Sequence, residues 1–407
     1  MSKTINIGKV ALTPKGRWSE DVEYESLDAV THSGCLWVAN DSNVGEEPSE
    51  ENEHWSLALD GSESVGSGTI AEVTAFLPDE IYVAVGRTVE IYNASVCADS
   101  DKYRFKWICD VGKAYGRKFS ITGDYDFIGE YPLTLQIYDR LDQLVYSKVA
   151  NVKIASTEAL EDLMICPLGD VYSAGKSWLE EVQNLSGLAI EFVGPRESES
   201  GIYHAGVAGW DTNTFLYSND AEDLESGELE SNMFCQGTRF EWSLFHYATD
   251  VSGVQLFFGE RELLNVSAEQ LAENLCEMIT SIRLDNACPV FVVLPPLWGT
   301  QDGMARQTTE GAGLDFSGKT KSECDKIIIS AAKTIVKNIT AKGFSNVYFV
   351  PLLSCFDSEN NMEIEEIAVN PRVSVTQTVQ KGAVQPSDAG YKQMADVFFS
   401  AYCAVFN

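Results

Sequence analysis

The hydrophobic positions of the chain follow two different patterns, and the change between them falls at about residue 160. Before this point, apolar and polar residues alternate in short runs separated by turn residues. After it, nearly continuous apolar runs alternate with longer segments that carry apolar residues at helical spacing. The first pattern is typical of strands with one buried face, and the second of a parallel sheet covered by helices. The sequence therefore predicts a multidomain chain, all-β in its first part and α/β in its second.

The alternating runs between residues 70 and 156 recur at roughly ten-residue spacing, as expected for a β-sandwich. They are residues 81–85, 88–92, 103–107, 118–121, 132–138 and 149–154. We predict an immunoglobulin-like sandwich over 70–156. Cys97 and Cys109 are too close in sequence to bridge facing strands of its two sheets, so we expect both to be structural thiols.

The α/β pattern begins with Leu163–Gly169, an apolar run that ends in a glycine and precedes a helical pattern from Trp178 onward. The later apolar runs are 254–258, 290–294 and 347–352, and the later helical patterns are 268–282, 324–342 and 388–405. This alternation predicts a three-layer α/β domain with a parallel sheet over residues 158–407. Because open α/β sheets bind ligands at the carboxyl ends of their strands, we expect a site at the turn after Gly169.

Residues 1–60 contain short alternating runs and predict a small all-β module. Trp18, Trp37 and Trp55 lie within it. In so small a unit, three tryptophans could form the core or a platform on which a sugar stacks, and the sequence leaves both alternatives open. Residues 61–69 are rich in glycine and serine, which is the composition of a flexible linker.

Charge and cysteine usage exclude several classes of function. The formal net charge is −32, from 61 Asp and Glu against 29 Lys and Arg, and binding to a phosphate backbone depends on basic side chains. We therefore expect no nucleic-acid partner. The ten cysteines are scattered without metal-binding spacing, so we predict no metal and no cofactor. No stretch has the length of a membrane span, and the first residues contain no signal-peptide core, so we expect neither membrane insertion nor a signal peptide.

The most specific motif follows the first strand of the α/β region. From Pro167 onward the sequence is P-L-G-D-V-Y-S-A-G-K-S-W-L-E-E-V. It resembles the first block of the SGNH (GDSL-type) hydrolases, in which Gly-Asp precedes the nucleophilic serine. The resemblance covers about residues 158–407 and implies a hydrolase fold. Gly169 and Asp170 match the family, but Val171 takes the position of the serine and has no nucleophilic atom.

The remaining blocks of the family can also be located. The resemblance implies that Gly206, in H-A-G-V-A-G-W, supplies a backbone amide to the oxyanion hole. Gly259 matches the glycine of the third block, where Arg261 takes the position of the asparagine that binds the oxyanion. In the last block, Gly382 takes the position of the relay aspartate and Gln385 that of the histidine. A glutamine cannot act as a general base near neutral pH.

Four catalytic positions of the family are thus replaced, and we predict a catalytically degenerate domain that is not an enzyme. The positions are Val171, Arg261, Gly382 and Gln385. The alternative is an active esterase or deacetylase that acts on acylated surface glycans with a relocated nucleophile. Ser173 with His204 is the candidate pair for it, and His246 is the other histidine of the domain.

The N-terminal module resembles the small domains, similar to carbohydrate-binding modules, that recur near the N-termini of bacteriophage tail and fibre proteins. This resemblance implies a virion structural protein, a head fibre or a tail fibre, that is made in the host cytoplasm. Its partners would be capsid or tail proteins, further copies of the chain in a homo-oligomer, and cell-surface glycans to which it adheres. The residues expected to bind glycan are Tyr172, His204, Trp210 and Arg261 in the cleft of the α/β domain, and Trp18, Trp37 and Trp55 in the module.

Overall fold

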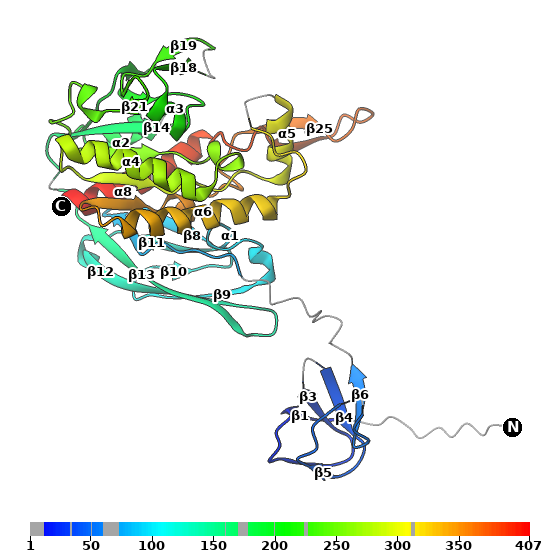
Figure 1. The fold of residues 1–407 in the computed structure, drawn as a ribbon. Coiled ribbons are helices and arrows are strands. Elements are labelled where there is room, and N and C mark those ends of the chain that lie inside the picture. Colours follow the sequence, from blue (N-terminus) through cyan, green and yellow to red (C-terminus); the bar gives the residue numbers. More distant parts are fainter. Residues whose placement is uncertain are drawn as a thin grey trace. The chain divides into compact units, whose positions relative to one another are not determined.

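The computed structural model describes residues 12–32, 35–49, 51–59, 73–158, 160–169, 178–198, 200–223, 227–310 and 314–407. The chain divides into two compact units, with the division between residues 72 and 73 (Figure 1). The first unit is built of strands and the second of strands and helices, so the prediction of a multidomain protein with an α/β part is confirmed. The predicted linker, 61–69, lies outside the described residues.

The first unit contains a four-stranded sheet in the order β1-β3-β4-β6. Its strands are β1 (Thr13–Arg17), β3 (Asp28–His32), β4 (Cys35–Ala39) and β6 (Trp55–Leu59), and a separate pair is formed by β2 (Glu23–Tyr24) and β5 (Asn43–Val44). Strand β1 runs parallel to β3, and the other neighbours in the sheet are antiparallel. The core of the unit is a small cluster made of Tyr24, Val30, Cys35, Trp37, Ala39 and Trp55.

The tryptophans of this unit belong to its core. Trp37 and Trp55 are buried, and their indole N–H groups donate to the carbonyls of His32 (3.3 Å) and Glu46 (2.8 Å). Trp18 is half-buried and packs its ring against His32 at a centroid distance of 5.2 Å. A sugar stacks only on an exposed ring face. The alternative of a sugar platform is therefore wrong for Trp37 and Trp55.

The second unit begins with two sheets that pack against each other; β7 runs parallel to β13, and the other neighbouring strands are antiparallel. One sheet has the order β7-β13-β12-β9 and the other the order β10-β11-β8. The strands are β7 (Glu80–Ala84), β8 (Thr88–Tyr92), β9 (Arg104–Ile108), β10 (Lys113–Ala114), β11 (Lys118–Thr122), β12 (Gly129–Tyr138) and β13 (Leu144–Ala155). Trp107 of β9 stacks on Phe119 of β11, which joins the two sheets. The six alternating runs predict six of these strands to within a few residues, and Cys97 and Cys109 are free thiols as expected.

The α/β part contains a parallel sheet whose central order is β15-β14-β22-β23-β24. Its strands are β14 (Leu163–Gly169), β15 (Ile190–Phe192), β22 (Gly253–Phe257), β23 (Val290–Val293) and β24 (Val347–Val350). At its carboxyl end β14 also pairs with β17 (Tyr203–Gly206), which is extended by the antiparallel β16 (Arg196–Glu197). In chain order the five parallel strands are arranged 2-1-3-4-5, one of the two common arrangements of doubly wound sheets.

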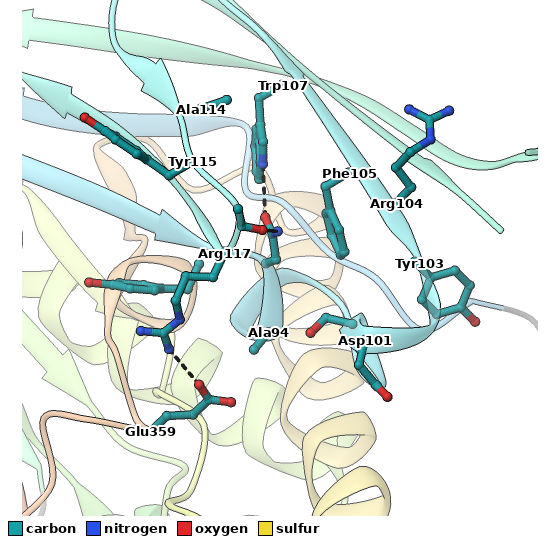
Figure 2. A pocket seen from close by; sticks show the side chains of 14 residues that line it. Ala94, Asp101, Tyr103, Arg104, Phe105, Trp107, Ala114, Tyr115, Arg117 and Glu359 are labelled. Atoms are coloured by element: carbon teal, nitrogen blue, oxygen red, sulfur yellow. Dashed lines mark hydrogen bonds and ion pairs between the residues drawn. The ribbon is translucent and has the colours of Figure 1, made fainter. Parts of the chain in front are cut away.

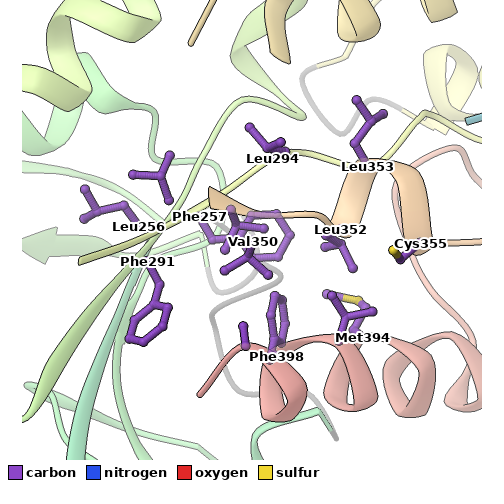
Figure 3. Close-up of a cluster of buried hydrophobic side chains, with 14 of the residues drawn as sticks. Leu256, Phe257, Phe291, Leu294, Val350, Leu352, Leu353, Cys355, Met394 and Phe398 are labelled. Atoms are coloured by element: carbon purple, nitrogen blue, oxygen red, sulfur yellow. The ribbon is translucent and has the colours of Figure 1, made fainter. Parts of the chain in front are cut away.

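Helices cover both faces of this sheet. Helix α2 (Trp178–Leu185) packs on α8 (Asp388–Phe406), and α4 (Ala268–Asp285) packs on α6 (Lys321–Ala341). Gln255 of β22 accepts a hydrogen bond from the Tyr402 hydroxyl of α8. Phe257 of β22 packs against Phe398 of the same helix (Figure 3). Val254 and Leu256 point to the other face, and they are buried as well. The prediction of three layers is confirmed.

The remaining elements are short or connect these layers. They are α1 (Asn93–Val96), η1 (Ser100–Lys102), η2 (Tyr125–Phe127), α3 (Thr212–Tyr217), β18 (Asp220–Glu222), β19 (Leu229–Ser231), β20 (Cys235–Gln236), β21 (Arg239–Phe240), η3 (Trp242–Leu244), η4 (Glu262–Leu264), α5 (Gln301–Glu310), α7 (Leu352–Cys355), β25 (Ile364–Ala368) and β26 (Thr376–Gln380). Across the described residues, no helix combines the length and the hydrophobicity that crossing a membrane requires.

Helix α8 lies between the parallel sheet and the two-sheet β part. On one side Phe398 packs on the sheet, and on the other the buried Ser400 Oγ accepts a hydrogen bond from the Ala84 amide at 3.0 Å. Gln393 of the same helix donates to the Tyr92 hydroxyl at 2.9 Å. The β part and the α/β part consequently share one continuous hydrophobic core.

Candidate functional site

The carboxyl edge of the parallel sheet brings the motif positions together. The order of the strands reverses at β14, which has the next strand along the chain, β15, on one side and β22 on the other. Gly169, the last residue of β14, lies opposite both Gly206 of β17 and Phe257 of β22. Gly259 follows two residues after β22 and has a φ of +113°, a conformation that favours glycine. Such a switch point is where open α/β sheets hold their ligands.

The last motif block reaches the same edge through a chain of hydrogen bonds. The indole N–H of Trp298 donates to the carbonyl of Glu260 at 2.6 Å, and the amide of Gly299 donates to the carbonyl of Ala383 at 2.8 Å. The residues 382–385 are thereby joined to the end of β22. Asp170, Val171, Tyr172 and Ser173, which follow β14, lie outside the described residues.

The amide of Gly206 is already engaged. It donates to Nδ1 of His204 at 3.1 Å, within a buried environment. A donor that is satisfied inside the protein is not presented to a substrate oxyanion. The implied role of Gly206 in the oxyanion hole is therefore wrong for this conformation.

His204 is unsuited to binding glycan or to removing a proton from a serine. It is buried, and burial lowers its pKa to about 4. Because Nδ1 accepts from the Gly206 amide, the ring proton resides on Nε2, which then has no lone pair to accept a proton. The other histidine, His246, is exposed and lies seven residues before β22, at the start of that strand rather than its end. The prediction that His204 acts as the base for Ser173 is therefore wrong.

The buried His204 predicts an acid-sensitive stability. The unfolded chain protonates this histidine near pH 6.5 and the folded chain only near pH 4, so the unfolded state binds more protons between these values. The contribution of His204 to the free energy of unfolding is fully present above pH 6.5, and it is lost as the pH falls from 6.5 toward 4. We expect wild type to lose about 2 kcal/mol more than His204→Gln between pH 7 and pH 4.5.

Urea unfolding at the two pH values measures this difference. The exposed His246→Gln serves as the matched control and should show the pH dependence of wild type. Equal pH dependence of wild type and His204→Gln would show that His204 is not held neutral by burial.

Trp210 is a core residue as well. It is buried, its indole N–H donates to the carbonyl of Glu222 at 3.1 Å, and its ring meets Phe215 edge-on at 5.2 Å. The guanidinium of Arg196 lies over the ring at 5.5 Å. The prediction that Trp210 presents an aromatic face to a glycan is wrong, because neighbours cover the ring.

The position of the family's relay aspartate is filled from another element. A Cβ on Gly382 would lie 2.5 Å from Oε1 of Gln307, which comes from α5 and also accepts a hydrogen bond from the amide of Ala383 at 3.1 Å. The carbonyl of Gln385 accepts from the amide of Glu363 at 2.9 Å. The backbone of the last block is thus fixed by a glutamine side chain and a neighbouring strand end.

Two acidic residues that the motif comparison does not single out flank Arg261 shortly after β22. Glu260 and Glu262 are only 1% and 5% exposed, and the partly buried Arg261 lies between them. Glu262 holds the start of α3, since its Oε2 accepts from the amide (3.0 Å) and the hydroxyl (2.9 Å) of Thr212. Ionised side chains are rarely buried unless they are paired or functional. The position of Glu260 and Glu262 shortly after an apolar strand is therefore the sequence signal that could have identified them.

The strand order and the place of the motif blocks define the α/β part as an SGNH-like domain. No family model and no curated protein sequence matches the chain. Among solved structures, a family 3 carbohydrate esterase of Clostridium thermocellum is similar over 58% of this chain and 93% of its own, at 19% identity and a TM-score of 0.34. A protein from Desulfitobacterium hafniense, assigned to the lipolytic G-D-S-L family, is similar over 58% of this chain and 97% of its own, at 14% identity and a TM-score of 0.33.

These comparisons contradict the prediction that the chain is not an enzyme, because the similar structures carry the names of hydrolases. That prediction was inferred from four motif positions. Their replacement excludes the family's own serine–histidine–aspartate relay, but it does not exclude a nucleophile or a base at other positions. The prediction is corrected accordingly.

Proposed function

We propose that the SGNH-like domain hydrolyses ester bonds of acylated glycans with residues other than the family's relay. The observation that carries the proposal is the buried charge at the carboxyl end of β22, where Glu260, Arg261 and Glu262 follow one another. Burying carboxylates is unfavourable unless the protein uses or pairs them. The switch point of an open α/β sheet is also where such folds hold their ligands. Glu262 is bound to Thr212, and Glu260 and Arg261 precede it directly in the sequence.

Each group has a defined role in this proposal. Ser173, in the segment that follows β14, is the nucleophile. Its hydroxyl proton passes to the carboxylate of Glu260 while Oγ bonds to the ester carbonyl carbon, and Arg261 donates hydrogen bonds to the resulting oxyanion. The C–O bond to the sugar then breaks, the sugar oxygen takes the proton from Glu260, and water hydrolyses the acyl-serine to release the acid. Strands β14 and β22 are neighbours, and Gly169 at the end of β14 lies opposite Phe257 at the end of β22. In the sequence, Ser173 follows the first of these residues and Glu260 the second.

Turnover of p-nitrophenyl acetate by the full chain tests the proposal. We expect hydrolysis above the buffer rate and labelling of Ser173 by a fluorophosphonate, both of which are lost in Ser173→Ala. The exposed Ser147→Ala, on β13, is the matched control and should retain both. Absence of turnover, or a Ser173→Ala variant as active as wild type, would contradict the proposed nucleophile.

We also propose that the chain is an appendage protein of a bacteriophage particle, as a homo-oligomer attached to capsid or tail through its first unit. The observation that favours this is that the first unit has a core of its own. In the same proposal the first unit is a carbohydrate-binding-module-like domain used for attachment, and the seven-stranded β part is immunoglobulin-like. Mass spectrometry of purified particles is the test: we expect stoichiometric amounts of the chain, and its absence from particles would contradict the proposal.

A further inference from the structure

A groove of about 560 Å³ lies in the β part of the second unit, away from the motif blocks (Figure 2). Three segments of the β part form its walls: the end of β8 with the start of α1, the stretch from η1 into β9, and the turn between β10 and β11. One residue comes from the α/β part. The lining residues are Tyr92, Asn93, Ala94, Ser100, Asp101, Tyr103, Arg104, Phe105, Trp107, Ala114, Tyr115, Gly116, Arg117 and Glu359.

Aromatic rings form much of the groove, and hydrogen bonds hold Trp107 in place. The indole N–H of Trp107 donates to Oδ1 of Asn93 at 3.0 Å, and the amide nitrogen of Asn93 donates to the carbonyl of Gly116 at 3.2 Å. These two bonds tie the strand β9 to the turn that carries Tyr115. The Tyr115 ring itself is 50% exposed; the ammonium of Lys113 lies over one face of the ring at 5.3 Å, and the remaining exposed surface is available to a ligand. Rings fixed in advance lose little conformational entropy when a ligand binds.

The guanidinium of Arg117 closes one end of the groove and is also fixed. It donates to both carboxylate oxygens of Asp357, at 2.9 and 3.1 Å, and to Glu359 at 2.6 Å. It also lies over the ring of Tyr92 at 5.5 Å. At the other end, the carboxylate of Asp101 is exposed and the hydroxyl of Ser100 is half-buried. The groove therefore combines aromatic faces with hydrogen-bonding groups at both ends (Figure 2).

This combination matches the chemistry of a pyranose ring. A sugar presents a C–H face that packs on aromatic rings and a rim of hydroxyl groups that bond to carboxylates and guanidinium groups. A polyanionic ligand is disfavoured, because both arginines of the groove are paired with carboxylates, Arg104 with Asp142 and Arg117 with Asp357, and the chain is strongly acidic. An extended proline-rich peptide, which also docks on aromatic rings, has no hydroxyl groups for Asp101.

We propose that this groove is a saccharide-binding site, separate from the proposed site of ester hydrolysis and independent of it. The groove binds a neutral oligosaccharide, with Tyr115 as a stacking residue and Asp101 as an acceptor for hydroxyl groups. It adjoins the loop that leads to the last motif block, because Gln380 donates to the carbonyl of Glu359 at 2.9 Å and accepts from the amide of Thr300 at 2.6 Å.

Titration calorimetry of the full chain with cellotetraose, xylotetraose and chitotetraose tests the site. None of these probes contains an acyl ester of the sugar hydroxyls, so the result does not depend on the proposed hydrolysis. We expect at least one probe to bind with a Kd below about 1 mM. Tyr115→Ala should weaken that binding about tenfold and Asp101→Asn about threefold, through loss of a stacking face and of a charged acceptor.

Tyr125→Ala is the matched control, because Tyr125 is 54% exposed but lies beyond the opposite end of β11, outside the groove. It should leave the Kd within about twofold of wild type. The proposal is overturned if no tetrasaccharide binds, if Tyr115→Ala and Tyr125→Ala have the same effect, or if a proline-rich decapeptide binds in the groove and the sugars do not.

Discussion

Replacing Gly194 by alanine is expected to destabilise the second unit severely. Gly194 follows β15, and the backbone of β17 crosses directly over it. An added Cβ would lie 2.0 Å from the carbonyl carbon and 2.1 Å from the oxygen of His204. These are backbone atoms that cannot rotate away, so β17 would have to leave β14, with which it pairs at Ala205 and Gly206.

The expected loss is about 3 kcal/mol or more, a large part of the stability of an ordinary domain. Urea unfolding followed by circular dichroism measures it, together with the yield of folded protein. Gly116→Ala is the control, since a Cβ there would meet nothing within 4 Å. A midpoint for Gly194→Ala equal to that of wild type would show that β17 does not cross the chain at this point.

Arg261→Ala is expected to lower kcat/KM for acetyl esters about 100-fold or more. The reason is that Arg261 takes the place of the family's oxyanion-binding asparagine, and the Gly206 amide is bound to His204 and not available as a second donor. Removing one donor from an oxyanion hole typically reduces the rate by about 10²–10³.

The kinetic comparison needs two controls. Arg239→Ala removes an exposed arginine of β21 and should leave kcat/KM unchanged. Thermal unfolding of Arg261→Ala separates a loss of transition-state stabilisation from a loss of folded protein. Unchanged kcat/KM in a folded Arg261→Ala variant would remove Arg261 from the proposed mechanism.

The regular elements could be predicted because each has a strong local signal. Leu133, Leu135 and Ile137 of β12 alternate with partly exposed residues, and Ser387 caps the start of α8 by accepting from the amide of Gly390. Strands β15 and β17 escaped prediction. They have three and four residues, too short for a periodic pattern to be recognised.

The sequence was sufficient to predict at which edge of the sheet the site lies, but not which side chains contact one another there. The blocks around Gly169, Gly206 and Gly259 do meet at one sheet edge, as the rule for α/β sheets predicts. The bond between Gly206 and His204 depends on the side chain of a residue only two positions earlier, a local competition that family motifs do not describe. Gln307 reaches Gly382 from 75 residues away in sequence, and no local pattern shows such a contact.

The aromatic residues show a second limit of sequence reasoning. Composition alone does not distinguish a tryptophan that binds a sugar from one that fills a core. Trp37, Trp55 and Trp210 are covered by their neighbours, whereas the exposed Tyr115 belongs to a groove assembled from segments of the β part and Glu359. Only the packing of the two sheets against the α/β part reveals which ring faces remain accessible.

The release of acetate from acetylated xylan by the purified full chain tests the proposed hydrolysis most directly. Proton NMR detects free acetate without a synthetic leaving group. We expect wild type to release acetate faster than buffer alone, with the rate lost in Ser173→Ala and reduced in Arg261→Ala. Acetate release at the buffer rate by folded wild-type protein, with p-nitrophenyl acetate also left intact, would contradict the account.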